Sequence, residues 1–341
     1  MSRSVAICAL LLAGCGGGDE GGLGDAGRAG DAQSADATPP PDADTLHPTR
    51  LRDTGLWSDF AGEVLADGVR AYRPEQVLWS DGATKRRWIY LPPGTTIDTS
   101  DMDYWVMPVG TKLWKEFTRD GTRVETRMLS KIAGGTWYRM AYAWNADQTE
   151  AVAVPDGVTD ALGTPHDIPS TNDCEKCHDR MPDVLLGFAA IQLDHPGPGV
   201  TLDSLVTDGL LSDPPTGSAP YFDIPGDATQ AAALRYLHGN CGGCHHPQSD
   251  VKDEVPLELR LEVDTLVDVT QTPAYITAVD VDSSLTLLAP DVTKIIASGD
   301  RAHSALYLRM TRRDMKQMPP LGTEEVDPTG SEAVGAWIDS L

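Results

Sequence analysis

Positive charge is scarce in this sequence. Its 341 residues include 27 Lys and Arg against 51 Asp and Glu, which gives a formal net charge of −24 at pH 7. A chain this acidic repels the phosphates of nucleic acid and the head groups of anionic lipid, so neither is an expected partner. The charge favours solubility and is compatible with a basic partner protein, but a solvated acidic surface without any partner explains it equally well.

Long hydrophobic runs are also missing. The apolar stretch Val5–Ala13 is far too short to span a bilayer, and with Arg3 before it has the form of a signal peptide. It ends in Leu12-Ala13-Gly14-Cys15, which resembles the lipobox of bacterial lipoproteins, so residues 1–14 are predicted to be removed and Cys15 to carry lipid. An ordinary signal peptide with a stray Cys is the alternative. Since Gly16 rather than Asp follows the Cys, we expect an exported protein whose lipid alone holds it to the outer membrane, on the periplasmic side or at the surface.

Large apolar side chains are nearly absent between residues 16 and 47, where Gly, Asp, Ala and Pro dominate. Such a segment cannot bury enough surface to offset the entropy lost on ordering, so residues 15–47 are predicted to be a disordered tether. The rest of the chain is long enough for two or three modest domains.

No disulfide is expected, because each of the six Cys is assigned to another segment or role. Cys8 and Cys15 lie in the N-terminal segment, and the other four form two pentapeptides of the type Cys-x-x-Cys-His, at 174–178 and 241–245. This pentapeptide is the covalent attachment signal for c-type haem, in which both thiols join one porphyrin edge and the His binds the iron. The chain is therefore predicted to hold two c-type haems. Their attachment residues are Cys174, Cys177, Cys241 and Cys244, and their iron ligands are His178 and His245.

Met318 is the candidate for the sixth iron ligand of the second haem. The prolines of Met318-Pro319-Pro320 cannot continue a helix and hold the Met in an extended loop, and a neutral thioether raises the haem potential. Met315 and Met310 are further candidates, and a Met that only fills core space is the alternative. For the first haem the possibilities are His195, His166 or an open position.

Residues 48–165 are predicted to form a Trp-rich antiparallel β sandwich or barrel whose aromatic residues supply the core. Partial alternation and Gly or Pro turns place strands at 86–91, 104–107, 112–118, 123–129 and 136–144.

Helices are expected in the rest of the chain, which makes the fold class α+β and multidomain. In 166–226, the polar residues 170–173 can cap a short helix at the first haem motif, and a Pro- and Gly-rich connection follows. In 227–341, helices are predicted after Asp227, from Ser304 to Met310, and after Asp327-Pro328. Two helices around a haem motif and a Met loop are the arrangement of a class I cytochrome c domain.

Several stretches, including both haem motifs, resemble a group of bacterial two-haem c-type cytochromes that are largely known as conserved hypothetical proteins. The matching stretches are 51–57, 78–83, 85–88, 108–111, 142–145, 174–178, 236–241 and 318–320. The resemblance implies haem content and export, without implying a substrate.

The sequence thus predicts an exported electron carrier that exchanges electrons with a redox protein donor or acceptor. A dihaem peroxidase-type enzyme with one open haem is the alternative from another class. A structural zinc protein, with the four motif thiolates in one site, is a third.

Overall fold

The computed structural model of the chain describes residues 47–284 and 289–341. They belong to one compact unit, residues 41–341. The predicted signal segment 1–14, Cys15 and nearly all of the predicted tether lie outside the described residues, and the predicted domain boundaries remain predictions. Among the described helices, none has the length and apolar character needed to cross a membrane.

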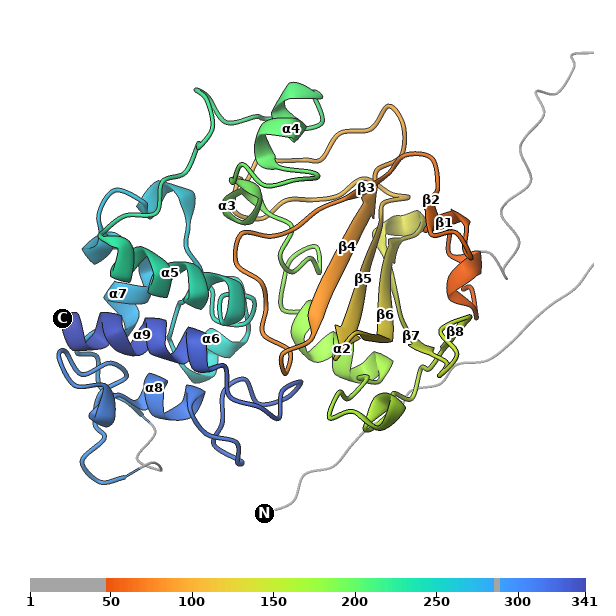
Figure 1. The fold of residues 1–341 in the computed structure, drawn as a ribbon. Helices are drawn as coiled ribbons and strands as arrows, with labels where there is room; N and C mark the ends of the chain where they lie inside the picture. Colours follow the sequence, from red (N-terminus) through yellow and green to blue (C-terminus); the bar gives the residue numbers. More distant parts are fainter. Residues whose placement is uncertain (1–46, 285–288) are drawn as a thin grey trace, which may run out of the picture. The chain divides into compact units, whose positions relative to one another are not determined.

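Most of the β structure is one six-stranded antiparallel sheet in which each strand pairs with the next along the chain (Figure 1). Its strands are β3 (Val69–Ala71), β4 (Thr84–Tyr90), β5 (Lys112–Arg119), β6 (Thr122–Lys131), β7 (Trp137–Trp144) and β8 (Ala151–Ala153). A second sheet contains β1 (Trp57–Asp59) and β2 (Val64–Leu65). The predicted antiparallel β structure is confirmed, and the six strands form a meander with β3 and β8 at its edges.

The strand predicted at 104–107 is wrong. Within it Val106 makes only an isolated bridge with Asp98. Trp105 is buried because it packs on Phe188, with ring centroids 6.0 Å apart, so its apolar character reflects packing against a distant segment rather than sheet pairing.

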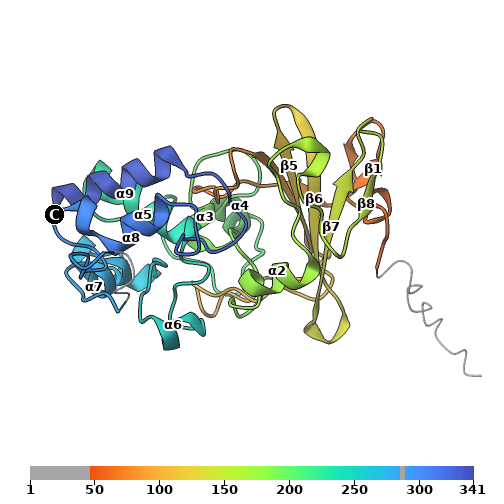
Figure 2. The same ribbon diagram turned by 90° about the horizontal axis from the view of Figure 1, so that it is seen from below.

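The two faces of the six-stranded sheet are covered differently. On one face Trp57 of β1 packs edge-on against Trp88 of β4, within a largely aromatic cluster, as expected for core residues. The other face is covered by residues 161–211: Leu113 packs in a cluster with Phe188, and Phe117 in a cluster with Ile168. The helix α2 (Thr171–His178) lies against β7 on this second face (Figure 2).

The remaining helices are short, apart from α5 and α9. They are α3 (Ala190–Leu193), α4 (Leu202–Thr207), α5 (Ala228–Asn240), α6 (Val251–Glu254), α7 (Pro273–Ala278), α8 (Ala305–Met310) and α9 (Pro328–Ser340). The helix starts predicted at Asp227 and at Asp327-Pro328 are confirmed, because each Asp carboxylate accepts two N–H groups of the first turn. The short helix predicted from Ser304 to Met310 is α8.

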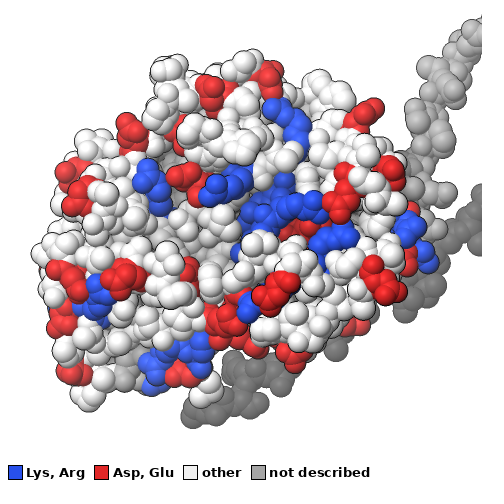
Figure 3. Space-filling model, in the orientation of Figure 1, with Lys and Arg blue, Asp and Glu red and all other residues white. Residues whose placement is uncertain are grey.

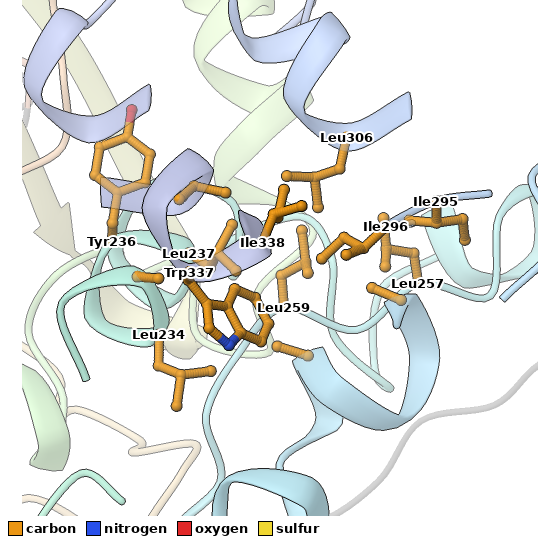
Figure 4. Packing of buried hydrophobic residues seen from close by; sticks show 14 of the residues in the cluster. Leu234, Tyr236, Leu237, Leu257, Leu259, Ile295, Ile296, Leu306, Trp337 and Ile338 are labelled. Atoms are coloured by element: carbon orange, nitrogen blue, oxygen red, sulfur yellow. The ribbon is translucent and has the colours of Figure 1, made fainter. Parts of the chain in front are cut away.

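Helices α5 and α9 pack closely and carry much of the C-terminal core (Figure 4). Trp337 and Ile338 of α9 lie beside Leu234 and Leu237 of α5, all of them buried. The close approach requires Gly330, since a Cβ atom there would lie 1.8 Å from Cε2 of Tyr236.

Candidate haem sites

The first Cys-x-x-Cys-His motif lies in α2, which begins with a capping box. Ser170 Oγ accepts the Asp173 N–H at 3.2 Å, and the Asp173 carboxylate accepts the Ser170 N–H at 3.3 Å. These bonds satisfy N–H groups that a helix start otherwise leaves unpaired. The helical spacing places Cys174 and Cys177 on the same side, with His178 at the end of the helix.

The ring of His178 is oriented by a backbone carbonyl. Its Nδ1 atom lies 2.6 Å from the oxygen of Val184, and because a carbonyl only accepts, Nδ1 carries the hydrogen. Burial lowers the pKa of His178 to about 4, so the ring is neutral and Nε2 keeps its lone pair. A ring with Nδ1 bonded to a carbonyl and a free Nε2 is the form of a metal-ligating His. The residue that supplies the carbonyl, Val184, has φ 55°, a strained value for a β-branched side chain.

The second motif begins where α5 ends. Cys241 caps the helix, and its carbonyl accepts the N–H groups of both Cys244 and His245 at 3.0 Å. Gly242 fits this turn because a Cβ atom there would lie 2.6 Å from the His238 oxygen.

His245 of the second motif resembles His178 in its surroundings. Burial lowers the pKa of His245, and the Leu257 backbone opposes this by favouring the protonated ring. The Nδ1 atom itself has no partner with full hydrogen-bond geometry among the described residues, so the ring is held less firmly than that of His178. The charge of Arg309 also lowers the pKa of His245. The backbone oxygen of Arg309 accepts the N–H of Met318 at 2.9 Å. Half-buried Met318 thus lies beside Arg309, a residue whose charge reaches His245.

The two motifs, far apart in the sequence, meet in the fold. The thiols of Cys177 and Cys244 lie close enough to act on each other, which lowers the pKa of Cys177 and raises that of Cys244. Arg180, two residues after the first motif, forms an ion pair with Asp250, five residues after the second. Groups attached at the two motifs would lie side by side.

The two His candidates for the sixth position of the first haem have other hydrogen bonds. His166 is buried, with Nε2 2.9 Å from a Glu125 carboxylate oxygen. His195 uses both ring nitrogens: Nε2 lies 2.7 Å from the Arg73 oxygen, and Nδ1 accepts the Gly197 N–H at 2.9 Å. The structure therefore gives both rings a structural role. Of the further Met candidates, Met310 is buried in the α5–α9 core and Met315 is fully exposed.

Asp81, which precedes β4, holds the loop between Met318 and α9. Its buried carboxylate accepts hydrogen bonds from Thr323 Oγ1 at 2.8 Å and from the N–H groups of Glu324 and Glu325 at 3.0 and 2.8 Å. The partners lie more than 240 residues from Asp81. Such a contact has no local signal in the sequence beyond the resemblance of residues 78–83 to the cytochrome group.

Trp79, two residues before Asp81, contacts the residue that precedes the second motif. Its N–H donates to Oδ1 of Asn240, the residue before Cys241, at 2.7 Å, and its indole N–H donates to the Glu325 oxygen at 2.9 Å. Residues 79–81 thus connect the end of α5 with the Met318 loop.

Within the part of the chain that the structure describes, no three His, Cys, Asp or Glu side chains are arranged to hold a metal ion by themselves. The described residues do fit c-type haem: each motif presents two thiols beside a neutral, partly buried His. No protein-family model, curated protein or solved structure matches this chain.

Proposed function

We propose that the protein is a dihaem c-type cytochrome that transfers electrons through two covalently attached haems. The observation that carries the proposal is the close approach of the two Cys-x-x-Cys-His motifs, where the Arg180–Asp250 ion pair joins the residues that follow them. Each motif also has its own neutral His. Two haems attached there would be neighbours, and short separations favour electron exchange within one molecule.

The bound haems would supply the Fe(II)/Fe(III) couple, and the chain's residues would set its potential and exclude water. Cys174, Cys177, Cys241 and Cys244 would hold the porphyrins, while His178 and His245 would bind iron. The carbonyl of Val184 keeps the first imidazole in the binding tautomer. Met318 would complete the second site, and Asp81 would keep its loop in place.

A class I cytochrome c domain in the C-terminal region is part of the proposal. Three features support it: the second motif follows α5 directly, the Met318 loop precedes α9, and these two helices pack tightly at Gly330 and Tyr236. The proposal further includes the resemblance to bacterial two-haem cytochromes, the attachment of lipid to Cys15 and export to the outer membrane. A redox protein is the proposed donor or acceptor, and the formal charge of −24 would suit a basic one.

A dihaem peroxidase-type enzyme is the second candidate, and a specific observation favours it. His166 and His195, the two His candidates for the first iron, are both hydrogen-bonded to other groups. If neither ring leaves its partner, the first iron keeps an open position at which a small oxidant could bind.

A carbon monoxide difference spectrum of the reduced protein separates the two functions. The protein is produced in a host with c-type haem maturation, and its two haems are counted first as pyridine haemochromes. The electron-carrier proposal predicts that neither haem binds the gas. Ready binding by one haem would favour the peroxidase-type enzyme. The variant Cys241→Ala/Cys244→Ala should keep one haem and serves to assign any binding to the first site.

A further inference from the structure

Three cations lie side by side on the sheet face that α2 covers. Arg87 of β4 is directly opposite Lys115 of β5, and Lys115 is directly opposite Arg127 of β6. Strands in a sheet are about 4.8 Å apart, so these three residues, here called the basic row, span roughly 10 Å. Like charges directly opposite one another destabilise a sheet, so the row needs a compensating charge.

The protein compensates only part of this charge. Arg127 is bonded to Glu125 at 2.5 and 2.9 Å, and the same carboxylate is shared with His166. Among the described residues, Arg87 and Lys115 form no hydrogen bond or ion pair with an acidic side chain. Arg87 is only 6% exposed, and Lys115 is partly buried with Nζ 4.8 Å from the centre of the Phe117 ring. Water therefore screens their repulsion poorly. Burial and the neighbouring charges of Arg87 and Arg127 lower the pKa of Lys115, so its charged form needs a counter-ion that the described residues do not supply.

The basic row lies between two apolar clusters of the same sheet face. Leu113, two residues before Lys115, belongs to the cluster of Phe188, and Phe117, two residues after it, belongs to that of Ile168. A group of Lys and Arg residues is visible at the centre of the face drawn in Figure 3. In a chain with a net charge of −24, this gathering of positive charge is a local exception.

The basic row also adjoins the first haem motif. The charge of Arg127 interacts with the thiols of Cys174 and Cys177, and the charge of Lys115 acts on His178. Helix α2, which holds this motif, packs on β7, the strand next to β6, and Arg139 of β7 forms an ion pair with Asp179 beside His178. A group attached at this motif would therefore lie over the same sheet face as the row.

We propose that the basic row is a binding site for a pair of carboxylates beside the first attachment motif. One carboxylate each for Arg87 and Lys115 would supply the missing counter-charges and keep Lys115 protonated, and guanidinium groups bind carboxylates through paired hydrogen bonds. The inference rests on the proposed function, because a haem attached at Cys174 and Cys177 brings two propionate carboxylates. A free dicarboxylate has the same chemistry and is the other source.

The test uses the sign of a stability change in the haem-loaded protein. If the row holds no anion, Lys115→Met or Arg87→Gln relieves repulsion and leaves Tm unchanged or higher. If it holds carboxylates, each substitution lowers Tm, by about 2–4 °C for the loss of one charged contact. Arg87→Lys keeps the charge and should retain most of the Tm. The control is Arg70→Gln, which removes a 40% exposed cation of β3 together with its surface ion pair to Asp208 and should change Tm little.

Two further measurements distinguish the source of the carboxylates. Haem propionates are assigned if Lys115→Met shifts the propionate bending bands of the resonance Raman spectrum and succinate leaves the wild-type Tm unchanged. A free dicarboxylate is assigned if succinate raises the wild-type Tm saturably but not that of Lys115→Met. The proposal is overturned if both row variants keep or raise the Tm and succinate has no effect. Failure of the cytochrome function is separate, since the wild-type protein would then carry no haem.

Discussion

The Nδ1 atom of His178 lies 2.6 Å from the carbonyl oxygen of Val184. A carbonyl can only accept, so this contact fixes the ring as the Nδ1–H tautomer and leaves Nε2 available to a metal. Val184 itself has φ 55°, a conformation that costs a β-branched residue about 1–3 kcal/mol. The strained residue orients the proposed iron ligand.

Replacing His178 by Ala is expected to change the spin state of one haem without releasing it. The thioether bonds at Cys174 and Cys177 would keep the haem, while the iron loses its proximal ligand. The optical spectrum should show one altered haem, and added imidazole should restore it. His245→Ala is the matched variant for the other motif. An unaltered spectrum in His178→Ala would show that this His does not bind iron.

Met318→Ala is expected to lower the potential of one haem, because a thioether stabilises the ferrous state. The decrease should be a sizeable part of the ~0.8 V range that axial ligands cover. A spectroelectrochemical titration measures it, and carbon monoxide should then bind the same haem. The control is Met315→Ala, which alters a fully exposed Met of the same loop. Identical titrations for wild type and Met318→Ala would leave Met318 a packing residue only.

Asp81→Ala is expected to loosen the Met318 loop from a distance. It removes a buried carboxylate that accepts three hydrogen bonds, at a cost of about 2–3 kcal/mol in the free energy of unfolding. Asp81 has φ 48° and the control Asp120 has φ 49°, so both Ala variants carry the same backbone strain. Only Asp81→Ala should weaken the Met–iron charge-transfer band of the oxidised protein. Equal bands in both variants would contradict a positioning role for Asp81.

The buried Glu125 is expected to make stability depend on acid pH. Burial alone would raise the pKa of Glu125, but Arg127 and His166 outweigh it and hold the pKa below its ordinary value. A lowered pKa stabilises the fold above the unfolded value of about 4.3, and this contribution is lost as pH falls through the folded pKa.

Urea unfolding of Glu125→Gln measures this contribution. At pH 7 the free energy of unfolding of the variant should be lower than that of the wild type by about 2 kcal/mol. Breaking a fully buried ion pair costs about 3–5 kcal/mol, and the smaller value is expected here because Arg127 is partly exposed. The difference from wild type should shrink below about pH 4. Glu150→Gln is the control, since Glu150 pairs with the 54% exposed Arg50. A difference that stays constant from pH 7 to 3 would rule out ionised Glu125 as its source.

Local signals were sufficient to predict the starts of α2, α5, α8 and α9 and the four long strands β4 to β7, but not the short strands β1, β2, β3 and β8. Ser170, Asp227 and Asp327 cap their helices as expected, because capping depends on residues within one turn. The alternation at 104–107 was misleading, since burial by a distant segment produces the same pattern as a strand. Helix α4 was not predicted in the Pro- and Gly-rich connection, where its six residues are too few to show a period.

The relationships that build the site depend on distant parts of the chain. The meeting of Cys177 with Cys244 follows from how the motifs pack, and no spacing in the sequence encodes it. Likewise, Arg87 and Lys115 become neighbours only through the register of β4 with β5. The two Cys-x-x-Cys-His motifs can be recognised in the sequence because each consists of contiguous residues, whereas the groups around them come from distant parts of the chain.

The intact mass of the purified protein, measured under denaturing conditions, tests the central claim most directly. The protein should come from a host with c-type haem maturation, together with a known cytochrome as a maturation control. We predict the mass of the processed chain plus two haems, and plus one haem for Cys174→Ala/Cys177→Ala. A wild-type mass equal to the chain alone, beside a fully loaded control cytochrome, would contradict the account.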